Sequence, residues 1–242
     1  MKYGIFSDIH SNLSALEAVM ASMDNMGVER RVCLGDLVGY CADVNSCVDL
    51  VRKKSDICIL GNHDSVAIRR ESSLHFNQYA RFAIDWTQQN LSKESLDYMG
   101  KLPYIVEEND LCFVHASPKS PADWSYVSSL DDADDAFEYF STKVCFVGHT
   151  HSPVIVVQDI KGLPFVIEED SHCCRPGERM LVNVGSVGQP RDRNPESCWC
   201  LLDSETFCVE FVRVPYDISR TQDTMRKLGL PVFLIQRIAE GR

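Results

Sequence analysis

Five apolar, strand-like runs of the sequence each end in side chains that bind metal ions in many proteins. The residues that follow the runs 3–7, 32–34, 57–60, 111–114 and 144–147 are, in order, Asp8 and His10, Asp36, Asn62 and His63, His115, and His149 and His151. A single histidine is usually an ordinary residue, but five of the seven histidines fall at these ends. Mixed nitrogen and oxygen ligands suit Mn, Fe, Zn or Co better than Ca or Mg. The pattern predicts a metal site, in which the two oxygens of Asp36 could bridge two ions.

Amphipathic helical segments separate the first three of these runs. Apolar residues recur at helical spacing over 13–26, with Gly27 as a stop signal, and again over 44–51. The resulting β-α-β-α-β order predicts parallel strands with right-handed crossovers, and it predicts ligands at the carboxyl ends of the strands. The metal-binding side chains follow those ends, so we expect the strand topology to bring them together.

The rest of the chain changes from helical to β-rich character. Helices are expected over 76–98 and 130–140, with a hairpin between them over 104–114. Antiparallel strands are expected at 153–158, 164–168, 179–184, 198–202 and 206–213. The segment 216–242 is expected to be helical, with a break at Gly229 and Pro231. Because no linker, repeat or low-complexity tract is evident, we expect one domain over 1–242.

Composition and charge narrow the class of protein. The chain has 242 residues and a formal net charge of −11. That charge argues against nucleic acid as a partner, since binding phosphate backbones requires a basic surface. No apolar run approaches the roughly 20 residues of a membrane helix, and the first residues lack the pattern of a signal peptide. We therefore expect a cytoplasmic protein without a membrane partner.

The 11 cysteines contain no C-x-x-C pair. Several of them lie inside apolar strand runs, where a free thiol behaves as a small hydrophobic group. Metal or redox sites at Cys173-Cys174 or at Cys198 and Cys200 are the less favoured interpretation, because no second pair stands at zinc spacing. Reduced thiols are expected throughout.

The metal-binding residues also resemble the signature of a known family. The matching motifs are, in order, Asp8-x-His10, Gly35-Asp36, Gly61-Asn62-His63-Asp64, His115 and Gly148-His149-x-His151. Together they are similar to the signature of the calcineurin-like metallophosphoesterases. The stretches 35–40, 76–77 and 185–192 further resemble a bacterial and archaeal phosphodiesterase-like branch. The resemblance covers nearly the whole chain.

This resemblance implies an α/β fold in which two mixed β-sheets pack face to face and are flanked by helices. It also implies how two divalent metal ions share the ligands. One ion would be held by Asp8, His10 and His151, the second by Asn62, His115 and His149, and Asp36 would bridge them. The β-α-β order of the first strands agrees with the first half of this fold.

A site with two such ions would hydrolyse a phosphate ester by attack of a metal-bridging hydroxide. Paired ions lower the pKa of a shared water and hold phosphate oxygens on both sides of an in-line displacement. His63 is the candidate for a general acid or transition-state stabiliser at the leaving oxygen. The alternative role for His63 is to position the neighbouring ligand Asn62.

The chain departs from the protein Ser/Thr phosphatases of this superfamily at one place. Those enzymes have Asp-Arg-Gly where this chain has Gly39-Tyr40-Cys41. The group that orients His63 must come from elsewhere, and Asp64 is the candidate. Arg191 is a candidate for binding a substrate phosphate, and a loop salt bridge with Asp192 is the equally favoured alternative.

The favoured function is that of a phosphodiesterase acting on small phosphate esters. A phosphomonoesterase or a dinucleoside-polyphosphate hydrolase would use the same residues. A non-catalytic, metal-binding scaffold is the alternative from another class of protein. Because such relatives lose the catalytic histidine or some ligands, the presence of His63 and of all seven ligand positions disfavours a scaffold.

Overall fold

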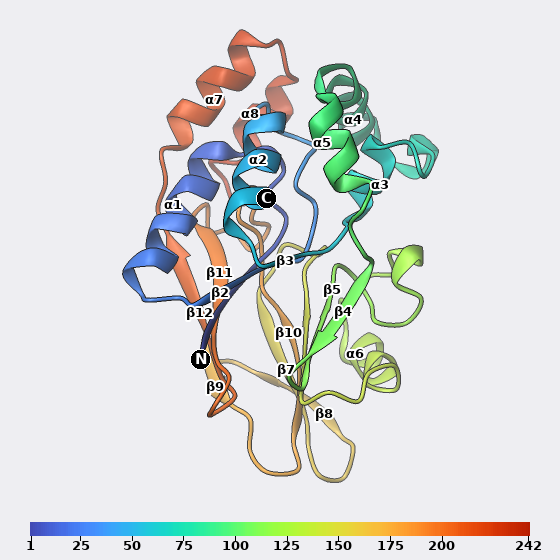
Figure 1. Ribbon diagram of the computed structural model, residues 1–242, viewed down its shortest axis with the longest axis vertical. Coiled ribbons are helices and arrows are strands. Elements are labelled where there is room, and N and C mark those ends of the chain that lie inside the picture. The colour runs from blue at the N-terminus through green and yellow to red at the C-terminus, as the bar shows by residue number, and fades with distance from the viewer.

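The parallel strands expected at the start of the chain form half of a first β-sheet. The computed structural model describes residues 1–242 (Figure 1). Strands β1 (Lys2–Phe6), β2 (Arg30–Cys33) and β3 (Ile57–Cys58) run parallel and are connected by helices α1 (Leu13–Asn25) and α2 (Val44–Lys54). Antiparallel strands β11 (Ser197–Asp203), β12 (Cys208–Val214) and β9 (Ser171–Cys173) complete the sheet in the order β3-β2-β1-β11-β12-β9. The sheet is mixed, as the resemblance implied.

A second six-stranded sheet has the order β4-β5-β6-β10-β7-β8. Its strands are β4 (Ile105–Glu108), β5 (Leu111–Val114), β6 (Val144–Val147), β10 (Arg179–Asn183), β7 (Val154–Gln158) and β8 (Pro164–Ile167). The pairs β5–β6 and β6–β10 are parallel, whereas the other three pairs are antiparallel. Both sheets therefore present parallel strand ends to the same region of the molecule.

The main core lies between the two sheets because alternate side chains of each strand point to opposite faces. On β6, Val144 and Phe146 belong to the cluster between the sheets. The intervening Cys145 and Val147 pack instead with helix α6 (Leu130–Phe137) on the outer face. The short apolar runs read from the sequence are thus strands that are covered on both sides.

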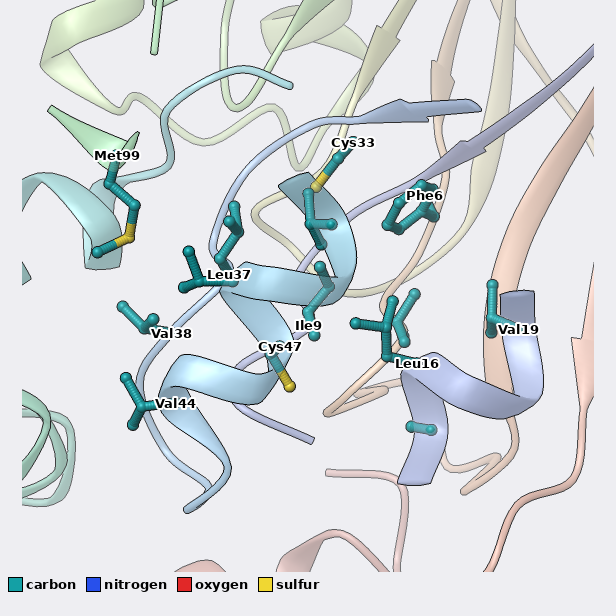
Figure 2. Packing of buried hydrophobic residues seen from close by; sticks show 14 of the residues in the cluster. Phe6, Ile9, Leu16, Val19, Cys33, Leu37, Val38, Val44, Cys47 and Met99 are labelled. Atoms are coloured by element: carbon teal, nitrogen blue, oxygen red, sulfur yellow. The ribbon is translucent and has the colours of Figure 1, made fainter. Parts of the chain in front are cut away.

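Helices cover the outer faces of both sheets. Figure 2 shows α1 and α2 packing against the first sheet through residues such as Leu16, Phe6 and Cys47. The remaining helices are α3 (Asn62–Ala67), α4 (Gln78–Asn90), α5 (Lys93–Met99), α7 (Ile218–Lys227) and α8 (Val232–Arg237), with one 3-10 turn each at Ser73–His75 and Pro121–Asp123. None of the helices combines the length and the apolar character that crossing a membrane requires.

The predicted fold class, two face-to-face mixed sheets flanked by helices, is confirmed. That residues 1–242 form one domain stays a prediction. Two short elements were not predicted, helix α3 and strand β9. Six and three residues long, they are too short and too polar for their periodicity to stand out.

The expectation that all cysteines are reduced is wrong for one pair. Cys173 on β9 and Cys208 on β12 are directly opposed in the antiparallel ladder and form a disulfide. The other nine cysteines are free, including Cys33, Cys112 and Cys145 in the apolar strands. A disulfide persists in oxidising surroundings, so this pair departs from the reduced compartment that the cysteine pattern suggested.

Candidate metal centre

All seven predicted metal ligands lie together at the carboxyl ends of β1, β2, β5 and β6 and at the start of α3. Each of these residues is buried and at most 7% exposed: Asp8, His10, Asp36, Asn62, His115, His149 and His151. Burying so many ionisable groups in one place is costly unless a charge of opposite sign compensates them. The cluster therefore has the composition of a cation site.

The first group of donors consists of Asp8, His10 and His151. His151 Nε2 lies 3.3 Å from Asp8 Oδ1, His10 Nε2 lies 3.8 Å from the same oxygen, and the two Nε2 atoms are 3.1 Å apart. An ion with ligand bonds of about 2.1 Å spaces adjacent ligands roughly 3.0 Å apart in an octahedron and roughly 3.4 Å apart in a tetrahedron. These three atoms have the spacing of ligands around one ion.

The second group contains Asp36, His115 and His149, with Asn62 beside them. His115 Nε2 lies 3.1 Å from Asn62 Oδ1 and 3.6 Å from Asp36 Oδ2. The same Asp36 oxygen lies 3.6 Å from His10 Nε2 of the first group. One oxygen therefore faces both groups, whereas Asp36 Oδ1 accepts the backbone N–H of His63 at 2.8 Å.

Backbone carbonyls determine which histidine nitrogen is free to bind a metal. His10 Nδ1 lies 3.0 Å from Val38 O, and His151 Nδ1 lies 2.6 Å from Gln189 O. Because a carbonyl oxygen only accepts, each Nδ1 must carry the proton, which leaves a lone pair on each Nε2. Two lone pairs that face each other across 3.1 Å repel unless a cation lies between them. His115 is held in the same way, with Nδ1 2.8 Å from Leu34 O.

Unpartnered atoms and shifted pKa values also fit a cation. Asp8 Oδ1 and His149 Nε2 are buried without any hydrogen-bond partner. Burial, and then the charge of His115, lower the pKa of His149 to about 3. Burial opposes the charge of Asp8, but the nearby histidines, His151 foremost, hold its pKa well below the usual range. Neutral imidazoles and ionised carboxylates are the protonation states that ligate metals.

The backbone is strained at this site. Asp8, His10, Asp36, His149 and His151 have φ values of 56°, 50°, 53°, 67° and 62°. Residues other than glycine rarely adopt this left-handed backbone conformation, which costs about 1–3 kcal/mol each. Such residues cluster at functional sites. The loops are held by hydrogen bonds such as Asp8 N to Gly35 O at 3.1 Å and His10 N to Asp36 O at 3.0 Å.

Gly148 is required because the loop before His149 approaches β1 too closely for a side chain. A Cβ at this position would lie 2.2 Å from Ser7 Oγ and 2.6 Å from Asp8 Oδ2. We expect Gly148→Ala to displace Asp8 and to lower the unfolding free energy by about 1–3 kcal/mol. The amount of metal bound per chain should fall as well. Denaturant melts and metal analysis would check this. Gly100→Ala is the matched control, since Gly100 has an ordinary φ of −60°, and equal effects of the two changes would contradict the prediction.

His63 lies at the edge of this cluster. Its ring is 4.8 Å from that of His10 and 4.7 Å from those of Tyr40 and Phe76, measured between centroids. Its Nδ1 is buried without a partner. Burial, followed by the charge of Arg191, lowers the pKa of His63 well below its ordinary value. The backbone N–H of His63 donates to Asp36, so the loop links the two residues directly.

Asp64 makes contacts different from the predicted contact with His63. Its Oδ1 accepts the backbone N–H of Val38 and its Oδ2 that of Gly61, both at 3.2 Å. Burial, and then the charge of Asp36, raise the pKa of Asp64 to about 8. Asp64 therefore fastens the loop after β2 to the start of α3, and the His63 ring is held by aromatic packing instead.

Arg191 also lies beside the cluster. Its Nη2 donates to Gln189 Oε1 at 3.1 Å and to the Tyr40 hydroxyl at 3.4 Å. Asp192 forms an ion pair with Arg213, so the alternative of an Arg191–Asp192 salt bridge is wrong. The charge of Arg191 contributes to lowering the pKa values of His63 and His151, which places the guanidinium within electrostatic reach of the centre.

A cavity of about 260 Å³ opens onto Asn62, His63 and His149. Much of its wall is aromatic and comes from three separate loops: Tyr40, Phe76, Trp124 and Tyr126. The Tyr126 ring stacks on His149 with centroids 4.0 Å apart. Sequence reasoning did not assign Trp124 and Tyr126, because an aromatic residue in a loop carries no periodic signal.

Two mixed sheets with helices outside, and a histidine- and carboxylate-rich centre at the strand ends, define the class of the metallophosphoesterases. A family model described as the calcineurin-like phosphoesterase superfamily domain matches residues 1–206, and the chain belongs to that superfamily. The expected family is thereby confirmed.

Three relatives are similar over nearly their whole length. An uncharacterized protein of Methanocaldococcus jannaschii is 39% identical over 242 residues, which are 98% of this chain and 97% of that protein. The crystal structure of a metallophosphoesterase from Sphaerobacter thermophilus is 39% identical with a TM-score of 0.89, covering 100% of this chain and 99% of that one. A hypothetical protein from Pyrococcus horikoshii OT3, 19% identical, shares the fold with a TM-score of 0.81 and covers 100% and 98% of the two chains.

Proposed function

We propose that this chain hydrolyses small phosphate diesters with the help of two divalent metal ions. Asp8, His10 and His151 would hold one ion and Asn62, His115 and His149 the other, with Asp36 between them. The observation that carries the proposal is the position of Asp36 Oδ2, 3.6 Å from His10 Nε2 and 3.6 Å from His115 Nε2. A single oxygen at equal distance from two donor groups is the arrangement that a shared ligand requires.

When bound, such ions lower the pKa of a water molecule and neutralise charge on phosphate oxygens. The chain supplies the remaining functions. His63, whose Nδ1 has no partner, lines the cavity and can donate a proton to a leaving oxygen. An anionic phosphate next to His63 would favour its charged form and raise the pKa that burial has lowered. The half-buried Arg191 would bind a phosphate of the substrate.

The volume and the aromatic lining of the cavity are the reason for proposing diesters over monoesters. Beside Asn62 and His149 there is room of about 260 Å³ with aromatic walls, which suits a second ester group. Hydrolysis of monoesters or of dinucleoside polyphosphates by the same residues is the second candidate. Of the metals that mixed nitrogen and oxygen ligands accept, manganese is the first choice for testing.

The decisive experiment uses metal-stripped protein reloaded with manganese. Hydrolysis of bis-p-nitrophenyl phosphate is compared with that of p-nitrophenyl phosphate, with Asp36→Asn as the blank. Faster diester turnover that disappears in the variant supports the proposal. A preference for the monoester would replace the phosphodiesterase by a phosphatase. Absence of turnover with two metal ions bound per chain would leave either a selective enzyme or the non-catalytic scaffold, which a substrate screen that includes dinucleoside polyphosphates would separate.

Replacing His63 by asparagine is expected to lower kcat about 10²–10⁴-fold while leaving the metal content unchanged. The reason is that His63 would serve the leaving oxygen and is not one of the seven ligands proposed for the two ions, although its ring lies close enough to His10 and Asp36 to be tested as one. The loss should be larger for esters with poor leaving groups, which depend most on proton donation. Steady-state kinetics on a series of phenyl esters, with metal analysis, would check this.

His172→Asn is the matched control for His63→Asn, since His172 lies on strand β9, outside the metal centre, and contacts Glu178. If His63→Asn loses metal in proportion to its activity, His63 serves to position Asn62, and the role in proton transfer is wrong.

A further inference from the structure

Two guanidinium groups share one aromatic ring next to the metal centre. The Cζ atoms of Arg191 and Arg237 each lie 5.8 Å from the centroid of the Tyr40 ring. The Tyr40 ring also contacts the centre itself, since its centroid is 4.6 Å from that of His10 and 4.7 Å from that of His63. The two cations are therefore one side chain away from residues of the site.

The C-terminal segment contacts the loop that carries Arg191. Helix α8 packs its apolar face into a cluster that contains Tyr40 and Cys41. Beyond α8, the backbone N–H of Arg193 donates to Gly241 O at 2.8 Å, and Arg237 Nε donates to the main-chain oxygen of Arg242. These contacts hold Arg237 beside Tyr40. The residues matched by the superfamily model end at 206, so Arg237 lies on a segment outside that match.

The charges of Arg191 and Arg237 are not matched by acidic side chains. Arginines nearby in the chain do have such partners, as in the pairs Arg213–Asp192 and Arg226–Asp223. Arg191 instead contacts the neutral groups of Gln189 and Tyr40, and its Nε is buried without a partner. Burial, and then the charge of Arg191, lower the pKa of Arg237. Two half-buried cations that repel each other form a local site for an anion.

We propose that Arg191 and Arg237 bind a second phosphate group, so that the preferred substrates are phosphate esters that carry a further phosphate beside the one hydrolysed. This inference rests on the proposed function, because the metal centre would hold the reacting group. The planar guanidinium fork matches phosphate oxygens in pairs. Arg237 thereby becomes a residue that determines substrate specificity, and the C-terminal helix becomes part of the binding site.

Binding of inorganic anions tests the inference independently of ester hydrolysis. Calorimetry on the manganese-loaded protein measures the affinities of orthophosphate, pyrophosphate and tripolyphosphate for the unaltered chain, Arg237→Gln and Arg226→Gln. We expect Arg237→Gln to lower the affinity ratio of the condensed phosphates to orthophosphate about tenfold. Arg226→Gln removes the same charge from an exposed pair on α7 and should leave the ratio unchanged. Equal losses for all three anions in Arg237→Gln would overturn the inference.

Kinetics on two matched esters give an independent test. The p-nitrophenyl ester of thymidine 5′-phosphate is compared with the same ester carrying a 3′-phosphate, so that the leaving group is identical. In Arg237→Gln the kcat/KM ratio of the second ester to the first should fall about tenfold, and Arg237→Lys should retain part of it. A lowered melting temperature with an unchanged ratio would show a purely structural Arg237 and refute the inference. If neither ester is hydrolysed, the proposed function fails, and the anion affinities still decide whether Arg237 helps to bind a second phosphate.

Discussion

Asp36→Asn is expected to lower kcat/KM for phosphate diesters at least about 10³-fold and to remove one or both metal ions. Asp36 Oδ1 already accepts the backbone N–H of His63, so the amide oxygen of the new side chain would take that place. The amide NH₂ would then point to where Oδ2 faces His10 and His115. An NH₂ group has no lone pair available for a metal ion, so the shared ligand is lost. Steady-state kinetics and metal analysis on the purified variant would check both effects.

The matched control is Asp134→Asn on the exposed side of α6, which removes the same charge far from the strand ends. It should keep both metal ions and full turnover. If Asp36→Asn kept two ions per chain and near-normal kinetics, the bridging role would be wrong, and the two donor groups would have to be separate sites.

The same substitution should have the opposite effect on the metal-free protein. Burial, and then the charge of Asp8, raise the pKa of Asp36 well above its usual range. Folding without metal therefore carries the cost of burying this carboxylate, and the cost grows as the pH rises above the pKa of an unfolded aspartate. A neutral amide in its place removes that cost. We expect metal-free Asp36→Asn to melt at a higher temperature than the metal-free parent at pH 7, and the loaded variant to melt lower than the loaded parent.

Removal of the metal ions is expected to lower the melting temperature by about 10–20 °C. An ion present at about 100 times its dissociation constant stabilises a protein by about 2.7 kcal/mol, so two ions contribute about 5 kcal/mol. For a chain of this length each kcal/mol shifts the melting temperature by about 2–4 °C. Without metal, two unfavourable features are left uncompensated. The Nε2 lone pairs of His10 and His151 face each other, with the two atoms 3.1 Å apart, and Asp8 Oδ1 has no partner. Calorimetric melts before and after chelation, with metal analysis, measure the shift.

Two controls belong with this experiment. Reloading with manganese should restore the original melting temperature, and His172→Ala should show the same shift as the parent because His172 lies outside the centre. A chelated protein that has lost its metal but melts at an unchanged temperature would contradict the prediction, since binding to the folded state alone must stabilise it.

The predictions for Asp36→Asn and for metal removal depend on residues that the sequence alone identified. The ligand candidates could be recognised because each follows a short apolar run, and the carboxyl ends of parallel strands meet at one edge of a sheet. The fold class was implied by the resemblance, and the β-α-β order read from the local periodicity agreed with its first half. Boundaries were close as well: the helix expected over 13–26 is α1 (Leu13–Asn25), and the hairpin within 104–114 is β4 and β5.

Other features depend on contacts between distant segments, for which the sequence carries no local signal. The disulfide between Cys173 and Cys208 required knowing that β9, a strand of three residues, pairs with β12. The contacts of Asp64 with Val38 and Gly61 required the relative position of two loops. In both cases side chains with several possible partners acquire one by packing, and a periodic pattern does not record that choice.

The sequence by itself therefore identified the candidate donors, their place at the strand ends, and the superfamily. Only the tertiary structure decided how those donors are surrounded. It placed Arg237, which is far along the chain from Tyr40, over the same ring as Arg191. The physical reason is that ligand type and strand period are properties of neighbouring residues, whereas this juxtaposition arises from the apolar burial of α8 against Tyr40 and Cys41.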